Sequence, residues 1–459
     1  MSSKVPFSFI VVIGLMLFAL FFGAGNLIFP AMLGQSAGTN IWAANAGFLV
    51  TGVGLPLIGV LAFGFSGKDD LQSLASRVHP LFGIVFTTVL YLAIGPLFAL
   101  PRAGSVAFEI GVKPFLTESS SFIPLLIFTI VFFGITCFFS LNPAKIVDMV
   151  GKVLTPIKLT FIGILVIVAF VRPIGDLQPP TEAYTSNSFF KGFQEGYLTM
   201  DTLASFVFGI IIINAIREKG ATTKKQIMAV CAKATAIAAT ILAVIYTALS
   251  YMGASSVEKL GHLDNGGAVL AKVSDYYFGS YGGILLGLMI TVACLTTSVG
   301  LVSACSSFFH KLFPNMSYKT IVIILSIFSA FVANFGLTQL IAISVPVLVA
   351  IYPLAIILIA LTFLHSFFKG RSEVYQGSLL STSIISVFDG LNAAGVHIQV
   401  INSFFTQVLP MHEVGLGWIL PAIIGGLAGY GISLVRVKNN LSIDNRQKKE
   451  GSVSSNKSA

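Results

Sequence analysis

The stretch Phe18-Ala-Leu-Phe-Phe-Gly-Ala-Gly-Asn-Leu-Ile-Phe-Pro30 places two glycines, an asparagine and a proline inside an otherwise apolar run. Each glycine weakens a helix by about 1 kcal/mol relative to alanine. The amide of Asn26 is polar where polarity is unfavourable, and Pro30 lacks a backbone donor. We therefore expect an unwound stretch near Phe22 to Asn26.

The sequence on both sides of this stretch has the composition of a membrane protein. Of its 459 residues, 55% are hydrophobic and 10% are charged, whereas about a quarter of a soluble domain is charged. Apolar runs recur at about 20 residues, the length of a spanning helix. They are continuous, as in Phe161 to Val171, and lack the alternation of a transmembrane strand. The sequence therefore predicts an all-α membrane protein.

We expect about twelve spanning helices, which places both termini on one side of the membrane. Their predicted bounds are 7–33, 41–66, 81–106, 122–140, 153–171, 196–216, 227–252, 283–309, 319–336, 338–364, 376–395 and 416–436. About 21 of the 27 lysines and arginines then fall on the side of the termini, which the positive-inside rule assigns to the cytoplasm. This topology accounts for the net charge of +9 without any nucleic-acid partner. The basic tail over 437–459 is expected to be cytoplasmic and disordered.

A break in the first helix has useful binding chemistry. Unwound backbone at membrane depth occurs where it is buried in protein or lines a cavity. Carbonyls at the end of the first half can hold a cation, and amides at the start of the second half can hold a carboxylate. Glycines can also simply let neighbouring helices pack closely, but Asn26 and Pro30 favour a functional break.

Helices six and eight carry further candidate groups. In helix six, Ser205 and Gly209 lie midway and Asp201 lies near the outer end. If the core consists of two five-helix halves, helices one and six are equivalent, and interruptions in both indicate a transporter site. In helix eight, Thr296-Thr-Ser298 either bonds back to the helix's own carbonyls or supplies hydroxyl oxygens to a hard cation.

Leu20-Phe-Phe-Gly-Ala-Gly-Asn-Leu-Ile-Phe-Pro30 resembles the N-terminal signature of the branched-chain amino acid:cation symporters, the BrnQ-type carriers of bacteria. The likeness extends over nearly the whole chain and includes Gly95-Pro-Leu-Phe-Ala-Leu-Pro-Arg102 and Asp389-Gly-Leu-Asn392. The resemblance implies the leucine-transporter fold, with two inverted five-helix repeats, two extra helices, and breaks in helices one and six.

This fold implies a single transporter domain over residues 1–436. The first repeat would cover about 7–171 and the second about 196–364, with the extra helices over about 376–436.

The resemblance also implies a substrate site. The amides of Ala24 and Gly25 would hold the substrate carboxylate, and Asn26 would serve a second sodium ion. Residues Ser205 to Gly209 would flank the substrate, with Phe206 and Phe208 forming an apolar wall around its side chain.

The implied sodium site lies between helices one and eight. The carbonyls of Ala19 and Phe22 would bind the ion together with Thr297 and Ser298, and Thr296 could replace either hydroxyl. Lys158 is the competing feature, because a lysine at this position resembles one that replaces sodium in proton-coupled carriers. Lys158 could equally extend to the inner surface as a topological anchor.

We therefore expect a symporter in the bacterial cell membrane that imports leucine, isoleucine and valine with Na+ or, alternatively, H+. No cofactor is expected beyond the coupling ion, the oligomeric state is open, and energy would come from a gradient because no ATP-binding motif is present. The sequence lacks the nucleophile–base set or metal ligands of an intramembrane enzyme and the filter motif of a channel. A non-transporting substrate sensor would share the same binding residues.

Two groups of charged residues are left with alternative roles. Arg102 and Glu109, near the outer end of helix three, could gate access or anchor a loop. Asp389, in helix eleven, is an acid at membrane depth, but it lies outside the expected ten-helix core, which favours a structural or interface role.

Overall fold

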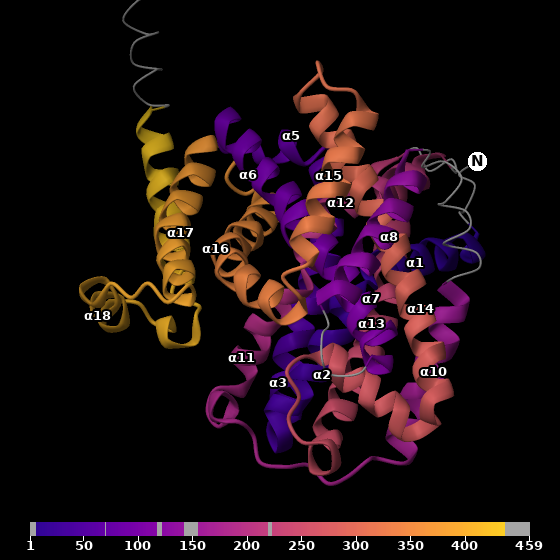
Figure 1. The fold of residues 1–459 in the computed structure, drawn as a ribbon. Coiled ribbons are helices and arrows are strands. Elements are labelled where there is room, and N and C mark those ends of the chain that lie inside the picture. The colour runs from indigo at the N-terminus through magenta and orange to yellow at the C-terminus, as the bar shows by residue number, and fades with distance from the viewer. Residues whose placement is uncertain (1–5, 69, 117–121, 142–154, 219–222, 437–459) are drawn as a thin grey trace, which may run out of the picture.

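The part of the chain that the computed structural model describes is helical and contains no strand; it consists of residues 6–68, 70–116, 122–141, 155–218 and 223–436 (Figure 1). Seven helices there are long and apolar enough to cross a membrane, or eight if a bent pair counts as one span. Shorter apolar helices accompany them. The all-α membrane fold is therefore confirmed, while the count of twelve spans stays a prediction.

The helices follow the predicted apolar runs closely. In chain order they are α1 (Phe7–Phe21), α2 (Ala24–Ala37), α3 (Ile41–Leu49), α4 (Leu55–Ser66), α5 (Leu71–Ala75), α6 (Pro80–Leu92), α7 (Ala99–Gly111), α8 (Phe122–Ser140), α10 (Thr155–Val171), α11 (Ser188–Glu195), α12 (Asp201–Glu218), α13 (Lys224–Leu260), α14 (Gly266–Leu312), α15 (Tyr318–Ala333), α16 (Leu337–Leu364), α17 (Ser372–Ala393), α18 (Gln399–Val408) and a final helix, Ile419–Arg436.

The first span is broken where the glycines predict it. Helix α1 ends at Phe21, Phe22 and Gly23 are non-helical, and α2 begins at Ala24. The break is shorter than the expected Phe22 to Asn26, because the chain becomes helical again directly after Gly23. Pro30 lies inside α2 and does not interrupt it.

The sixth span is also broken, but not near Ser205 and Gly209. Met200 has a positive φ of 64°, and the segments Ser188–Thr199 and Asp201–Glu218 meet there at an angle of 47°. Helix α12 runs without interruption through both expected positions. The reason is packing: Ser205 lies against Gly59 of α4, and Gly209 lies against Phe63 of the same helix.

Two other spans depart from a straight helix. Gly95 has non-helical angles between α6 and α7, next to Pro96. Helix α14 starts earlier than expected and contains a kink at Gly279, where φ is 63°. Both kinks occur at glycine or proline, the usual chemical causes of helix distortion.

The centre of the molecule is held by close backbone contacts of α2. A Cβ on Gly34 would lie 1.9 Å from the carbonyl oxygen of Ser250, and one on Gly253 would lie 2.0 Å from that of Ala31. A Cβ on Gly266 would lie 1.8 Å from the carbonyl of Ile28. Small residues therefore let α2 pack directly on the backbones of α13 and α14, as is common between membrane helices.

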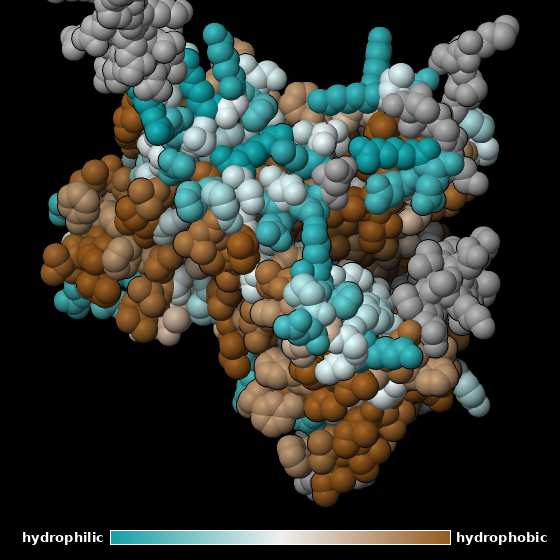
Figure 2. Space-filling view, turned by 90° about the horizontal axis from the view of Figure 1, so that it is seen from above, coloured by the Kyte–Doolittle hydropathy of each residue, from teal (hydrophilic) through white to brown (hydrophobic). Residues whose placement is uncertain are grey.

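The periphery is apolar. Ile123, Ile127 and Ile130 are exposed along one face of α8, a spacing that produces a continuous stripe on a helix. Figure 2, which views the molecule from the end that carries α5 and α15, shows hydrophilic residues across the centre and apolar residues around much of the edge. Helix α17 packs against α16 at one side (Figure 1). This distribution is that of a helical bundle in lipid.

Candidate substrate and ion site

The break in the first span is stabilised by the side chain of Asn26. Its Oδ1 accepts a hydrogen bond from the backbone N–H of Gly23 at 3.0 Å, so Asn26 reaches back to the start of its own helix. The Gly23 N–H, which belongs to neither helix, has a second acceptor in the carbonyl oxygen of Phe21 at 2.7 Å. The same asparagine that marks the break in the sequence therefore also caps α2.

The other end of the Asn26 amide joins a buried polar cluster. Its Nδ2 donates hydrogen bonds to Asp201 Oδ2 and to the hydroxyl of Tyr246. Tyr246 in turn donates to Asp201 Oδ2 at 3.2 Å. The cluster thus connects α2, α12 and α13, and its acid stands in the first turn of α12, where the helix dipole favours a negative charge.

Arg102 approaches the break from α7. Its Nη1 donates to the carbonyl oxygen of Leu198 at 2.6 Å, and its guanidinium carbon lies 4.9 Å from the ring centre of Phe29. A Cβ on Gly25 would lie 2.8 Å from Arg102 Nη2. The guanidinium can therefore reach the first turn of α2 only because residue 25 is glycine.

These groups surround a small cavity of about 40 Å³ at the two breaks. Its lining combines the start of α2, charged residues from α7 and α12, and apolar side chains: Leu20, Phe21, Gly23, Ala24, Gly25, Asn26, Ile94, Ala99, Arg102, Ala103, Thr199, Met200, Asp201, Ala204, Phe208, Thr297 and Leu301. From α12 the cavity meets Asp201, Ala204 and Phe208, which share one helix face.

A larger cavity of about 610 Å³ adjoins the small one. Leu20, Phe208, Thr297 and Leu301 line both. The larger cavity extends toward the end of the molecule that carries α5, where it is lined by Asp70, Lys311 and Tyr318 among others. It is therefore a vestibule that leads from one face of the bundle to the broken helices.

An exposed ion pair lies beside the vestibule. Lys311 Nζ is 2.6 Å from Asp70 Oδ2, and Asp70 also caps α5 through Ser73. Burial raises the pKa of the Asp70 carboxyl, but the hydrogen bonds from Lys311 and Ser73 outweigh it and hold the pKa below its usual value. Asp70 is therefore ionised at neutral pH, and the contact is a charged one.

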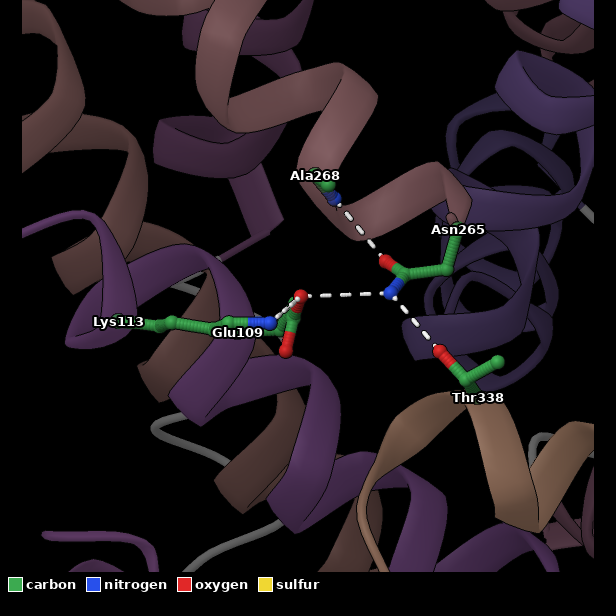
Figure 3. A network of polar contacts seen from close by, with 5 residues as sticks. All are labelled: Glu109, Lys113, Asn265, Ala268 and Thr338. Carbon is green, nitrogen blue, oxygen red and sulfur yellow. Dashed lines mark hydrogen bonds and ion pairs between the residues drawn. The ribbon is translucent and has the colours of Figure 1, made fainter. Parts of the chain in front are cut away.

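The opposite end of the molecule is joined by polar contacts between three helices. Asn265, which precedes α14, donates to Glu109 Oε1 of α7 and to the hydroxyl of Thr338 in α16, both at 3.3 Å (Figure 3). Lys113 pairs with the same carboxylate at 2.7 Å. Glu109, Lys113, Asn265 and Thr338 are called the outer cluster below. It connects α7, α14 and α16 on the side away from the vestibule.

The predicted substrate residues fall into two groups. Ala24, Gly25, Asn26 and Phe208 line the small cavity. Ser205 and Gly209 pack against α4, and Phe206 is fully buried; none of these three residues lines either cavity described above. Contact with substrate stays a prediction for all seven.

The predicted sodium ligands are also placed unevenly. Thr297 lies close to the break, since a Cβ on Gly23 would be 3.7 Å from its Oγ1. Thr296 and Thr297 both donate to the carbonyl oxygen of Ala293, so these hydroxyls do bond within their own helix. Ser298 is buried, and its hydroxyl has no hydrogen-bond partner in the described part of the chain.

The other two predicted sodium ligands come from α1 and from the break that follows it. Ala19 lines the vestibule and Phe22 is buried at the break. Lys158 belongs to α10, but its side chain lies outside the described part of the structure. The tail over 437–459 lies outside the described residues as well.

Sequence reasoning did not bring together two charged residues that line the small cavity. Arg102 was expected to gate or anchor near the outer face, and Asp201 to lie near an outer helix end, yet both line the small cavity. Tyr246 was not singled out at all. The available signal was that Arg102 and Asp201 interrupt apolar runs, because ionisable residues at membrane depth are rare without a function.

Broken spans that meet around a polar cavity, with a vestibule to one face, define a membrane transport protein. The structure resembles Mhp1, a nucleobase-cation-symport-1 family transporter solved with bromovinylhydantoin bound, with a TM-score of 0.62 and 12% identity over 94% of this chain and 93% of that one. It also resembles MhsT in complex with L-phenylalanine, with a TM-score of 0.54 and 17% identity over 92% and 97%. These likenesses establish the fold.

Sequence comparison then gives the family. Residues 8–436 match the family described as branched-chain amino acid transport protein. The chain is 71% identical to the branched-chain amino acid permease BrnQ of Bacillus subtilis, over 96% of this chain and all of that protein. It is 52% identical to the permease BraB of the same species, over 95% and 97%, and 42% identical to BrnQ of Escherichia coli K12, over 90% and 93%.

The chain therefore belongs to the branched-chain amino acid transport protein family. Its members are permeases, so this chain is a multi-pass membrane transporter and not an enzyme.

Proposed function

We propose that this protein imports leucine, isoleucine and valine into the cell together with a cation, by alternating access. The observation that carries the proposal is the small cavity at the two helix breaks, which joins buried charges to the apolar side chains of Leu20, Phe208 and Leu301. The printed names of the relatives at 71% and 52% identity agree with this substrate class.

The cavity supports aliphatic substrates without strong discrimination among them. Apolar walls separate homologues that differ by one methylene only about 10- to 200-fold. Leucine, isoleucine and valine should therefore compete for one site.

We place both termini in the cytoplasm, following the distribution of lysine and arginine. The vestibule beside Asp70 and Lys311 then opens to the cytoplasm, while the outer cluster joins α7, α14 and α16 on the external side. This combination corresponds to an inward-facing state of an alternating-access cycle.

We propose Na+ as the coupling ion, held between the α1–α2 break and α14. Two observations support this site, because Na+ is a hard ion suited to oxygen ligands. Thr297 lies beside Gly23, and the buried hydroxyl of Ser298 has no hydrogen-bond partner among the described residues. The alternative is H+ coupling through Lys158.

The deciding experiment is uptake of radiolabelled leucine into proteoliposomes, with sodium and proton gradients imposed separately. We expect accumulation with the sodium gradient alone, and a higher sodium concentration for half-maximal uptake in the double variant Thr297→Ala, Ser298→Ala. Accumulation with the proton gradient alone would instead assign coupling to H+. Folded protein that accumulates leucine under neither gradient would exclude symport.

A further inference from the structure

The small cavity contains two ionisable side chains of opposite sign, Arg102 and Asp201. Arg102 and Asp201 are 4% and 3% exposed, and both line the cavity. Removing a charge from water is unfavourable by several kcal/mol unless a partner compensates. Within the described residues, however, no ion pair within 4 Å joins the two side chains.

Arg102 has donor capacity that the protein does not use. A guanidinium carries five N–H donors, and the contact to the carbonyl of Leu198 occupies Nη1. Nε is buried and has no hydrogen-bond partner among the residues that the structure describes. The guanidinium stays beside the first turn of α2, since it lies over the ring of Phe29 and against Gly25. A carboxylate placed there would meet both the guanidinium fork and the positive end of a helix.

Asp201 presents the complementary group. The hydrogen bonds from Asn26 and Tyr246 both end on its Oδ2, which fixes the orientation of the carboxylate. An ionised carboxylate offers about four acceptor positions on its two oxygens. An ammonium group that entered the cavity could therefore still find an anionic acceptor at Asp201.

We infer that Arg102 and Asp201 together recognise the two charged groups of an α-amino acid: Arg102 binds the carboxylate and Asp201 binds the ammonium. This inference rests on the proposed function and adds the residues that select its substrate class. An amino acid is zwitterionic, so one ligand compensates both buried charges at once. A compound with only one of the two groups would leave one of these protein charges buried without an opposite charge.

The shape of the cavity agrees with this assignment. About 40 Å³ accommodates a few waters or the charged groups of a ligand. The aliphatic side chain would extend past Leu20, Phe208 and Leu301, which also line the vestibule. Charged groups would therefore sit at the helix breaks and the side chain on the vestibule side.

Three compounds test the inference: leucine, 3-methylbutylamine, which lacks the carboxylate, and 4-methylpentanoate, which lacks the ammonium. Their affinities follow from the concentration dependence of the rise in Tm of the purified protein. For the unmodified protein we expect leucine to bind at least about 30-fold more tightly than either analogue, because each analogue leaves a desolvated charge unpaired.

The two variants should lose different preferences. Arg102→Gln should lower the preference for leucine over 3-methylbutylamine to below about 5-fold and keep the preference over 4-methylpentanoate. Asp201→Asn should show the opposite pattern. Arg102→Lys keeps the charge without the guanidinium fork, and its preference for leucine over 3-methylbutylamine should be intermediate. This variant also covers the case that Arg102→Gln does not fold.

Matched controls are available elsewhere in the chain. Arg77 also donates to a backbone carbonyl, that of Ser66, and also has an unpartnered buried nitrogen. Asp389 of α17 is an acid with one carboxylate oxygen that lacks a hydrogen-bond partner in the described part of the chain. Neither residue lines the small cavity, so Arg77→Gln and Asp389→Asn should keep both preferences.

Folded Arg102 and Asp201 variants that keep both preferences would overturn the inference. Asp201→Asn protein that keeps both preferences but loses its sodium dependence would assign Asp201 to the coupling cation instead. Unmodified protein that binds none of the three compounds would reject the proposed substrate class, a failure distinct from that of the two residues.

Discussion

At the scale of single residues, the candidate site depends on a missing side chain. Gly25 has ordinary helical geometry at the start of α2. Glycine is therefore needed here because a side chain would not fit, and not because of its backbone freedom. The guanidinium of Arg102 occupies the place where a side chain would otherwise project. One glycine thereby determines how closely a buried charge can approach the helix break.

Gly25→Ala should reduce leucine uptake by more than about 10-fold while insertion and folding remain normal. The added Cβ would lie 2.8 Å from Arg102 Nη2 and 3.2 Å from Phe29 Cε2. Both atoms are at the ends of side chains that can move, so the protein folds but the guanidinium is displaced. A shift of about 1 Å in a positioned group can lower a rate about 100-fold.

Uptake into cells, with the amount of membrane-inserted protein measured in parallel, checks this expectation. Gly163→Ala in α10 is the matched control, because no atom of the described residues lies within 4 Å of a Cβ there, and it should transport normally. Undiminished uptake by Gly25→Ala would remove this glycine from the account of the site.

At the scale of elements, the outer cluster is a contact that alternating access must break. It joins α7, α14 and α16 through Glu109, Asn265 and Thr338 (Figure 3). In the proposed orientation these contacts hold the external side closed. A hydrogen bond to a charged group stabilises a state by about 1.5–3 kcal/mol, so the cluster is strong enough to bias the conformational equilibrium without locking it.

Glu109→Ala should shift the protein toward the outward-facing state by roughly 10-fold, as expected for the loss of one such contact. The reporter is Ser303→Cys, since Ser303 lines the vestibule. Labelling of this cysteine from the cytoplasmic side should slow in the Glu109→Ala background. Glu373→Ala removes a comparable contact, to Arg436 at 3.2 Å, away from the outer cluster and should leave the labelling rate unchanged. An equal rate in both backgrounds would contradict a gating role.

At the scale of the whole molecule, the two faces of the bundle differ. The vestibule of about 610 Å³ reaches the broken helices from one end, and polar contacts join the helices at the other. A transporter that exposes one binding site to each side in turn requires this asymmetry.

The cysteine in Ser303→Cys should therefore react with a membrane-impermeant maleimide from the cytoplasmic side and not from outside. Leucine with sodium should slow the reaction, because bound substrate occupies the inner end of the vestibule and favours its closure. His262→Cys, at an exposed position just after α13, should react from outside and report the opposite face. Reaction of Ser303→Cys from outside alone would reverse the proposed orientation.

The amino-acid sequence by itself determined the class, the approximate helix bounds and the first break. These depend on local chemistry: apolar length makes spanning helices, and the Gly-Ala-Gly-Asn stretch weakens one helix where it occurs. Asn26 also acts locally, since it bonds to the N–H of Gly23 three residues earlier. The resemblance to branched-chain amino acid carriers started from the same stretch, extended over nearly the whole chain, and is confirmed by the family match.

Only the tertiary structure decided which polar groups meet. The break in the sixth span falls at Met200 and not near Gly209, because α4 packs against the expected position. Asn26, Asp201 and Tyr246 come from three helices far apart in the sequence. Arg102 reaches Gly25 across the bundle. Such approaches depend on how helices pack on one another, and the residues of a single helix carry no information about the neighbour that will cover them.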